Sequence, residues 1–168
     1  MSYSQHFQAA KDYIDHTDEI VSAINDPGVK QQYIGFISTS TVTAFELAIK
    51  EVLYLFAEKK HRVFGSFVEN TYKSINGRIT LDDLRKHHIP RFGEKYVKRF
   101  NKVLEEQERE YLKQHGRSIK SSYGQILVCR HTFVHQGSVP SNITYEEIVK
   151  SFEPGKKVVD TLDQIMVR

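Results

Sequence analysis

Cysteine is almost absent from this chain, and that excludes two common kinds of covalent or metal support. Cys129 is the only cysteine among the 168 residues. An internal disulfide needs a second cysteine, and a cysteine-rich zinc site needs several. Both are therefore excluded, and we expect an intracellular, reducing environment.

Long hydrophobic runs are absent as well. No stretch of the chain reaches the length of about 18 consecutive apolar residues at which a membrane-spanning helix is considered. The opening segment, MSYSQHFQAAKDYIDH, lacks the apolar centre with basic flanks that marks a secretory signal. We therefore expect a cytoplasmic protein with no membrane partner.

A strong excess of either charge is also missing. The chain has 24 Lys and Arg against 21 Asp and Glu, which gives a net charge of +3. So mild a balance permits a polyanionic partner without requiring one, because affinity for nucleic acid depends on local clusters of charge. What is present, 39% hydrophobic and 27% charged residues, is typical of a globular protein and not of a disordered one. The length fits a single domain over residues 1–168.

Apolar residues recur at intervals of three and four along most of the chain, which is the period of an amphipathic α-helix. These intervals predict helices over residues 4–26, 30–60, 64–75, 81–88, 92–114 and 125–136. Thr80 is the expected N-cap of the fourth helix, because Asp82 and Asp83 follow it in the first turn. Residues 115–124 are predicted to form a turn and the entry into the sixth helix.

The C-terminal part of the chain begins with a second capping signal. Thr144 and Glu147 form the S/T-x-x-E capping box that opens a helix. The sequence EPG at 153–155 is expected to kink or interrupt this helix, and a short final helix follows it. No convincing strand pattern and no long linker occurs, so we predict an all-α helix bundle with short connections and short additional helices.

Positive charge is concentrated in RKHHIPRFGEKYVKRFNK, residues 85–102, where seven basic residues stand against Glu94 alone. A solvated helix face is one interpretation, since charged outer faces are common. The other is an RNA-binding surface, because lysines near a helix start oppose the helix dipole and the acidic residues are segregated after them. The residues of this surface would be Arg91, Lys95, Lys98, Arg99 and Lys102. Their aromatic neighbours are expected in the core.

The stretch QILVCRHTFVHQG, residues 125–137, places Arg130, His131 and His135 in an otherwise apolar run. Three interpretations stay open. The histidines share a helix face, so they can be partly buried structural residues, or they can bind a metal ion, although no third ligand stands in a recognisable local pattern. The third interpretation is metal-free RNA cleavage. In that reaction a histidine removes the proton of the 2′-hydroxyl and an arginine stabilises charge on the phosphate.

The spacing of Arg130 and His135 raises a geometric problem for the third interpretation. Five positions on an ideal helix separate two side chains by about 140° around the axis and about 7.5 Å along it. An arginine that curls toward the histidine would bring them together. So would a second copy of the chain that adds its own pair across a groove, and this solution predicts a homodimer.

The segment RHTFVH, residues 130–135, follows the pattern R-x4-H with a polar residue directly after the arginine. It resembles the signature of the HEPN superfamily. Two more segments, STSTVTAFELAIKEVLYLFAEKK and INGRITLDDLRK, resemble its prokaryotic branch called RiboL-PSP-HEPN or MAE_28990-like. The resemblance covers the chain from about residue 30 onward. HEPN proteins are small and all-α, and many of them are metal-independent ribonucleases.

The resemblance implies an endoribonuclease without metal or other cofactor. Arg130 and His135 would be its catalytic pair, and His131 would orient them or the phosphate. Family members dimerise so that two motifs meet in a cleft, and their cleavage leaves a 2′,3′-cyclic phosphate. Glu46 corresponds loosely to a polar residue that some members direct at the site. Glu46 and Lys50 also fit an ordinary i, i+4 surface pair.

Such proteins commonly act as toxins or antiviral effectors. The expected partners are therefore RNA, a second copy of the chain and an inhibitor (antitoxin) protein. One branch carries a tyrosine two residues after the histidine as a target for modification. Gly137 stands in that place here, which argues against that form of control. Some HEPN domains have lost catalysis, so the alternative is a non-catalytic helical module that binds nucleotide, RNA or a protein partner.

Overall fold

The computed structural model describes residues 3–167, and helices account for most of them. No strand occurs among those residues, and the elements are α1 (Ser4–Ser22), α2 (Pro27–Lys60), α3 (Arg62–Tyr72), α4 (Leu81–Asp83), the π-helix η1 (Leu84–His88), the 3₁₀-helix η2 (Ile89–Phe92), α5 (Glu94–His115), α6 (Ile119–Gln136) and α7 (Tyr145–Val167). The predicted all-α bundle is confirmed.

Local capping explains where the helices begin. Asp26 accepts hydrogen bonds from the backbone of α2, whose first residue is Pro27, a favoured first helical position. Thr80 is the N-cap of α4, as the sequence predicts, and it forms a reciprocal capping box with Asp83. Thr144 does the same with Glu147: its N–H donates to Oε2 at 2.8 Å, and its hydroxyl accepts from the Glu147 N–H at 3.2 Å.

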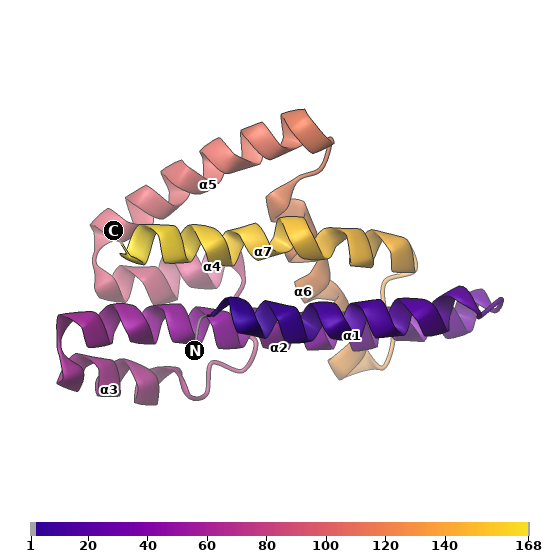
Figure 1. Cartoon of the computed structure of the whole chain (residues 1–168), viewed down its shortest axis with the longest axis horizontal. Coiled ribbons are helices and arrows are strands. Elements are labelled where there is room, and N and C mark those ends of the chain that lie inside the picture. Colours follow the sequence, from indigo (N-terminus) through magenta and orange to yellow (C-terminus); the bar gives the residue numbers. More distant parts are fainter. Residues whose placement is uncertain (1–2, 168) are drawn as a thin grey trace.

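The long helix α2 is the centre of the fold and packs against α1, α3, α6 and α7. Figure 1 shows α1 and α7 running alongside it, while α5 diverges from this layer at an angle. Phe45 of α2 has no exposed surface. Its ring stacks on Tyr123 of α6 and on Phe152 of α7, with centroids 5.4 and 6.2 Å away. These rings fix α6, the helix of the R-x4-H motif, to the core.

The helix entry predicted within residues 115–124 lies at Ile119, because the Ser118 hydroxyl accepts the Ser121 N–H at 2.9 Å and caps α6 six residues before residue 125. Another local prediction is wrong. The EPG sequence does not interrupt α7, which continues through Pro154. Proline removes one backbone hydrogen bond there. Gly155 beside it packs closely: a Cβ at this position would lie 3.3 Å from both Phe45 and Ile126. The close packing of this segment therefore outweighs the loss of one backbone hydrogen bond at Pro154.

The irregular segment between α3 and α5 also departs from the pattern. The predicted helix over 81–88 is one turn of α-helix followed by a π-helix and then by a 3₁₀ turn, so α5 begins at Glu94 and not at residue 92. π-helical turns occur often at functional sites. This one places His88 inside the protein, where it is only 7% exposed.

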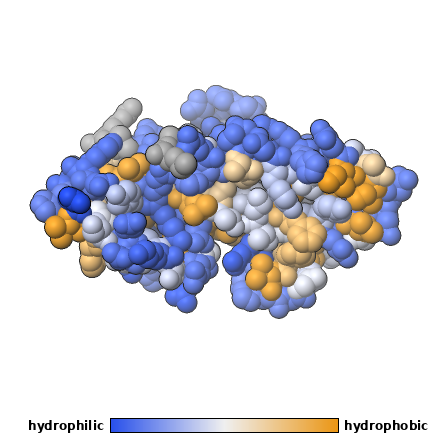
Figure 2. Space-filling view, turned by 60° about the horizontal axis from the view of Figure 1, so that its bottom comes forward, coloured by the Kyte–Doolittle hydropathy of each residue, from blue (hydrophilic) through white to orange (hydrophobic). Residues whose placement is uncertain are grey.

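The surface is mostly hydrophilic with separate hydrophobic patches in the view of Figure 2. The large apolar side chains that are most exposed are Val63, Phe67, Val128 and Val134. Among the helices of the described residues, none combines the length and the apolar character that crossing a membrane requires.

Candidate active site

Helix α6 carries the motif residues and is held by one apolar face. Ile119, Tyr123, Ile126 and Cys129 are buried against the core. Burial raises the pKa of the Cys129 thiol to about 11, so this cysteine stays protonated and is no nucleophile. The helix ends at Gly137, whose φ of 67° and N–H donated to the Phe133 carbonyl form a left-handed cap.

Arg130 leaves α6 toward a loop that is distant in sequence. The residue is half-buried. Its guanidinium lies so close to Gly77 that a Cβ at that position would be 3.2 Å from Nη1. Gly77 also has a φ of +77°, which favours glycine. None of the ion pairs found among residues 3–167 involves Arg130. Arg130 is thus a positioned cation that has no carboxylate partner among the described residues.

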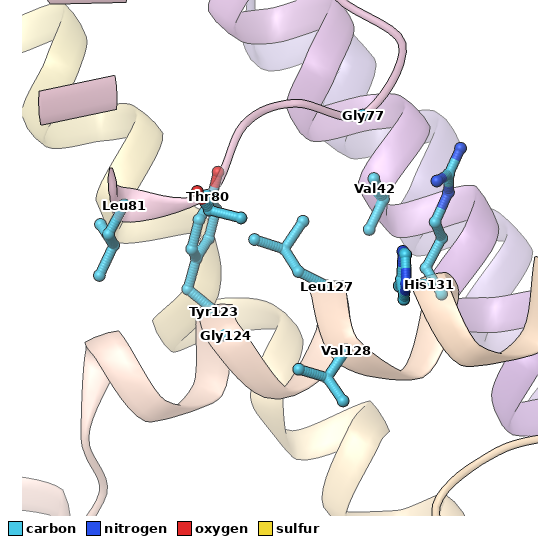
Figure 3. A pocket seen from close by; sticks show the side chains of 10 residues that line it. Val42, Gly77, Thr80, Leu81, Tyr123, Gly124, Leu127, Val128 and His131 are labelled. Carbon is cyan, nitrogen blue, oxygen red and sulfur yellow. The ribbon is translucent and has the colours of Figure 1, made fainter. Parts of the chain in front are cut away.

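A cavity of about 340 Å³ opens beside Arg130. Its walls come from three elements: α2, the segment from Gly77 to Leu81, and α6. The lining residues are Val42, Gly77, Thr80, Leu81, Tyr123, Gly124, Leu127, Val128, Arg130 and His131. Figure 3 shows the loop that carries Gly77 and Thr80 on one side of the cavity and α6 with Leu127 and Val128 on the other. His131 and Val42 lie together at one end.

The two histidines of the motif lie side by side. His131 and His135 are both exposed, and their ring centroids are 4.6 Å apart with an interplanar angle of 51°. His131 lines the cavity together with Arg130, whereas His135 does not. No hydrogen bond joins Arg130 to His135 in the described part of the chain. Within a single chain, Arg130 and His131 therefore share a cavity, and His131 contacts His135. Arg130 and His135 are not brought together, so the separation of about 140° around the helix that the sequence pattern implies is not overcome.

Glu46 forms hydrogen bonds with the loop that carries Gly77 and with Lys50. Its Oε2 accepts the Gly77 N–H at 2.6 Å, and its Oε1 accepts from Lys50 Nζ at 2.6 Å. The expected i, i+4 pair with Lys50 is present. The second bond is the informative one, because it fixes the residue that contacts the Arg130 guanidinium. Glu46 thus acts on Arg130 through Gly77, and its two oxygens already have partners.

The segment Lys73 to Thr80, named here the 73–80 loop, is fixed by side chains from four directions. Besides the bond from Glu46, Lys50 Nζ donates to the Lys73 carbonyl at 3.2 Å and the buried Tyr123 hydroxyl donates to the Ile79 carbonyl at 2.5 Å. His88 Nε2 lies 2.7 Å from the Arg78 carbonyl. A loop bonded at four backbone positions has little freedom, so it forms a rigid wall for Arg130.

His88 makes its contact as a neutral imidazole. A carbonyl can only accept, so Nε2 carries the proton, and the buried Nδ1 has no partner. Burial is the main reason that the pKa of His88 is lowered, and it outweighs the hydrogen bond to Arg78, which raises the pKa. The Tyr72 ring packs on the imidazole at a centroid distance of 5.3 Å.

The comparisons with known proteins identify the family of this chain. The family model for RiboL-PSP-HEPN matches residues 4–168. The chain belongs to the RiboL-PSP-HEPN family. In the searches of curated proteins and of solved structures, nothing matches. The family match includes α1, which lies outside the segments that carry the resemblance in the sequence.

The five residues of the predicted RNA-binding surface of this RiboL-PSP-HEPN protein are all exposed. Arg91 lies in η2 with its guanidinium carbon 5.7 Å from the centre of the Tyr72 ring, and Lys95 Nζ lies 5.0 Å from the centre of the Tyr96 ring. The other members, Lys98, Arg99 and Lys102, project from α5. Tyr96 and Phe100 are buried, which confirms that the aromatic neighbours belong to the core. None of the five basic residues lines the cavity.

Several residues of the site were missed by sequence reasoning. His88 has no local signal in the sequence, because its contact with the Arg78 carbonyl depends on how the segment folds. Tyr123 and Gly124 lie in a segment predicted only as a turn and helix entry. Gly77 has no signal either, because Arg130 and Glu46, which contact it, are distant in the sequence. No group of three or more His, Cys, Asp and Glu side chains with metal-binding geometry was found in the described residues.

Proposed function

We propose that this protein is a metal-independent endoribonuclease that works as a homodimer, with a role as a toxin or defence effector. The observation that carries the proposal is Arg130, a half-buried cation at a cavity with no carboxylate partner in the described chain, followed on the same helix by two histidines in ring contact. An uncompensated guanidinium favours an anion, and phosphate oxygens match its planar fork. The family supports RNA as the source, because HEPN domains are often ribonucleases.

The proposed reaction needs only groups of this chain and of the RNA. His135 takes the proton of the 2′-hydroxyl, the 2′-oxygen bonds to phosphorus, and the bond from phosphorus to the 5′-oxygen breaks. The leaving oxygen takes a proton from a second imidazole, so the products are a 2′,3′-cyclic phosphate and a 5′-hydroxyl. Arg130 stabilises the charge that gathers on the phosphate oxygens. His131 orients the His135 ring and faces the phosphate.

A second copy of the chain would supply the geometry that one chain lacks. Arg130 points to Gly77, whereas His131 and His135 are exposed on α6. Val128 and Val134 of the same helix are 51% and 50% exposed, which gives this side apolar surface to bury. Packing against a partner would cover the valines, bring a second His135 to the cleft and exclude water, which strengthens electrostatic interactions. Sedimentation should show a dimer at micromolar concentration, and a strict monomer would contradict this arrangement.

The cleavage test uses labelled RNA in EDTA. Wild-type protein should cut it, and Arg130→Ala and His135→Ala should each lose about 10²–10⁴-fold in rate. His16→Ala and Arg109→Ala, at exposed positions on α1 and α5, are the matched controls and should cut normally. A single 2′-deoxy nucleotide at the cut position should abolish cleavage there, because the attacking oxygen is gone. Loss of activity in EDTA would point to a metal-dependent reaction instead.

The alternative is a non-catalytic module that binds nucleotide, RNA or a protein. The absence of a bond between Arg130 and His135 in the described chain favours this alternative more than any other observation. Binding assays on the same variants separate the two. If wild type, Arg130→Ala and His135→Ala all leave every RNA intact while Arg130→Ala binds RNA more weakly, the protein binds and does not cut.

A further inference from the structure

Most of the cavity beside Arg130 is not used by the proposed reaction. Of the residues that line it, the reaction uses only two: Arg130, which stabilises the phosphate, and His131, which orients His135. The other walls come mainly from apolar or small residues, which are Val42, Gly77, Leu81, Gly124, Leu127 and Val128, and Thr80 and Tyr123 complete them. A cavity of about 340 Å³ with such walls is at the lower end of the size range of small-molecule sites.

The two polar side chains in these walls, Thr80 and Tyr123, already have hydrogen-bond partners. The Thr80 hydroxyl donates to Asp83 Oδ2 at 2.6 Å and accepts the Asp83 N–H at 3.0 Å. The Tyr123 hydroxyl donates to the Ile79 carbonyl. The walls therefore offer apolar surface to a ligand, and the groups that still seek a partner are those of Arg130 and His131 at the end of the cavity.

We propose that this cavity holds the base of the ribonucleotide that adjoins the phosphate bound by Arg130. The inference rests on the proposed function, since it takes RNA as the ligand. Charge complementarity selects the occupant: a nucleotide has an anionic group for the unpaired guanidinium and, one sugar away, a flat ring whose faces are apolar. An apolar side chain of a protein partner would fill the cavity but would give Arg130 no negatively charged partner.

The walls of the cavity also determine how well the site distinguishes one base from another. A base in this cavity contacts Leu81, Leu127 and Val128 with its faces, and its polar edges stay at the open mouth. Because the Thr80 and Tyr123 side chains are already hydrogen-bonded, the side chains of these walls do not distinguish bases by hydrogen bonds. The site accepts all bases with modest preferences, as stacking surfaces for single strands do.

Gly124 provides a clean way to close the cavity. It lies within α6 and lines the cavity, and a Cβ built on it meets nothing within 4 Å. A larger side chain there enters empty space, and both Ala and Leu are better helix formers than Gly. Gly124→Leu therefore fills the cavity without straining α6, and Gly124→Ala is the matched control that leaves most of it open.

The first experiment combines an RNA that lacks one base with the variant Gly124→Leu, in which the cavity is filled. An RNA with one abasic ribonucleotide, which keeps its 2′-hydroxyl, is compared with intact RNA. For wild type, kcat/KM should fall about 10-fold or more when the abasic position adjoins the cut, and should not change when it lies far away. Gly124→Leu should cut intact RNA at that reduced rate and show no further loss with abasic RNA. Equal sensitivity of both proteins to base removal would overturn the proposal.

The second experiment does not depend on cleavage or on the Leu variant. Adenosine 5′-monophosphate and ribose 5-phosphate are titrated into wild-type protein while the methyl NMR signals of Leu81, Leu127 and Val128 are followed. The proposal expects shifts with the nucleotide, and weaker binding with shifts absent from these methyls for ribose 5-phosphate. Equal binding of both compounds overturns it. Nucleotide-specific shifts in a protein that cuts no RNA would retain the base site and reject the ribonuclease.

Discussion

Two regions of this molecule concentrate positive charge, and they differ in how that charge is held. Arg130 is half-buried and lies against Gly77 of a loop that four side chains fix through its backbone. The basic residues of η2 and α5 are exposed, and the charged groups of Arg91 and Lys95 lie over the rings of Tyr72 and Tyr96. A fixed cation can recognise one phosphate in one geometry, whereas mobile exposed cations attract any polyanion through the field that they share.

The largest effect on RNA cleavage is expected at Arg130, where the planar pair of guanidinium donors matters. Arg130→Lys keeps the charge but loses the planar pair of donors, so kcat/KM for RNA cleavage should fall about 10²-fold. Arg99→Lys makes the same change on the exposed surface of α5 and should leave cleavage unchanged. Steady-state kinetics of both variants measure the difference directly. Equal effects at the two positions would remove the distinction between a fixed and a mobile cation.

The wall behind Arg130 gives the next effect. Gly77→Ala adds a Cβ 3.2 Å from Nη1 and must displace the guanidinium, which should lower kcat/KM about 10-fold. Gly116→Ala is its control, because Gly116 has a similarly positive φ of 64° with no atom near its Cβ. Both variants should lose roughly 1 kcal/mol of unfolding free energy from backbone strain. If Gly116→Ala loses as much activity as Gly77→Ala, strain and not Arg130 explains the result.

A smaller effect, and one on binding alone, is expected on α5. Replacing Lys95, Lys98 and Lys102 by Ala should reduce the slope of log binding constant against log salt concentration by about 2. The rate at saturating RNA should not change, because these residues do not reach the cavity. A triple variant at Lys11, Lys59 and Lys113 removes equal charge elsewhere and should keep the wild-type slope. An unchanged slope on α5 would make that surface an ordinary solvated helix face.

The smallest effect concerns the fixed loop and pH. Burial lowers the pKa of His88 from its ordinary value of 6.5, so the unfolded chain binds this proton more readily than the folded chain. The contribution of His88 to stability is therefore complete above pH 6.5 and is lost as the pH falls through the lower folded value. His88→Gln can still donate to the Arg78 carbonyl but cannot take up the proton.

Urea unfolding at several pH values tests this prediction. The unfolding free energy of wild type should decline more steeply toward about pH 5 than that of His88→Gln. The exposed His87→Gln should follow wild type. Parallel curves for wild type and His88→Gln would mean that this histidine does not titrate with the opening of the 73–80 loop.

The helices were predicted well because their causes are local. The capping boxes at Thr80 and Thr144 each involve residues three positions apart, and both are present. The same reasoning failed at Pro154. Proline ends an isolated helix, but here contacts of the neighbouring Gly155 with α2 and α6 keep the segment helical. Near Ser118 the reasoning located the entry of α6 but did not identify the N-cap residue.

The site divides in the same way. Arg130, His131 and His135 stand out because charge interrupts an apolar run on one helix, and their catalytic roles remain predictions. Glu46 was suggested by resemblance, but its bond to Gly77 joins residues 31 positions apart and has no local signature. The contacts of His88 with Arg78 and of Tyr123 with Ile79 are of the same kind.

The sequence by itself determined that this chain is a helical RiboL-PSP-HEPN protein with an R-x4-H motif, because helical period, capping and motif are patterns of neighbouring residues. Only the tertiary structure decided that Arg130 is held against a rigid loop, that His131 and not His135 shares its cavity, and that Gly124 leaves this cavity open. Those properties depend on which distant side chains reach the same backbone atoms and the same empty space, and packing alone brings them together.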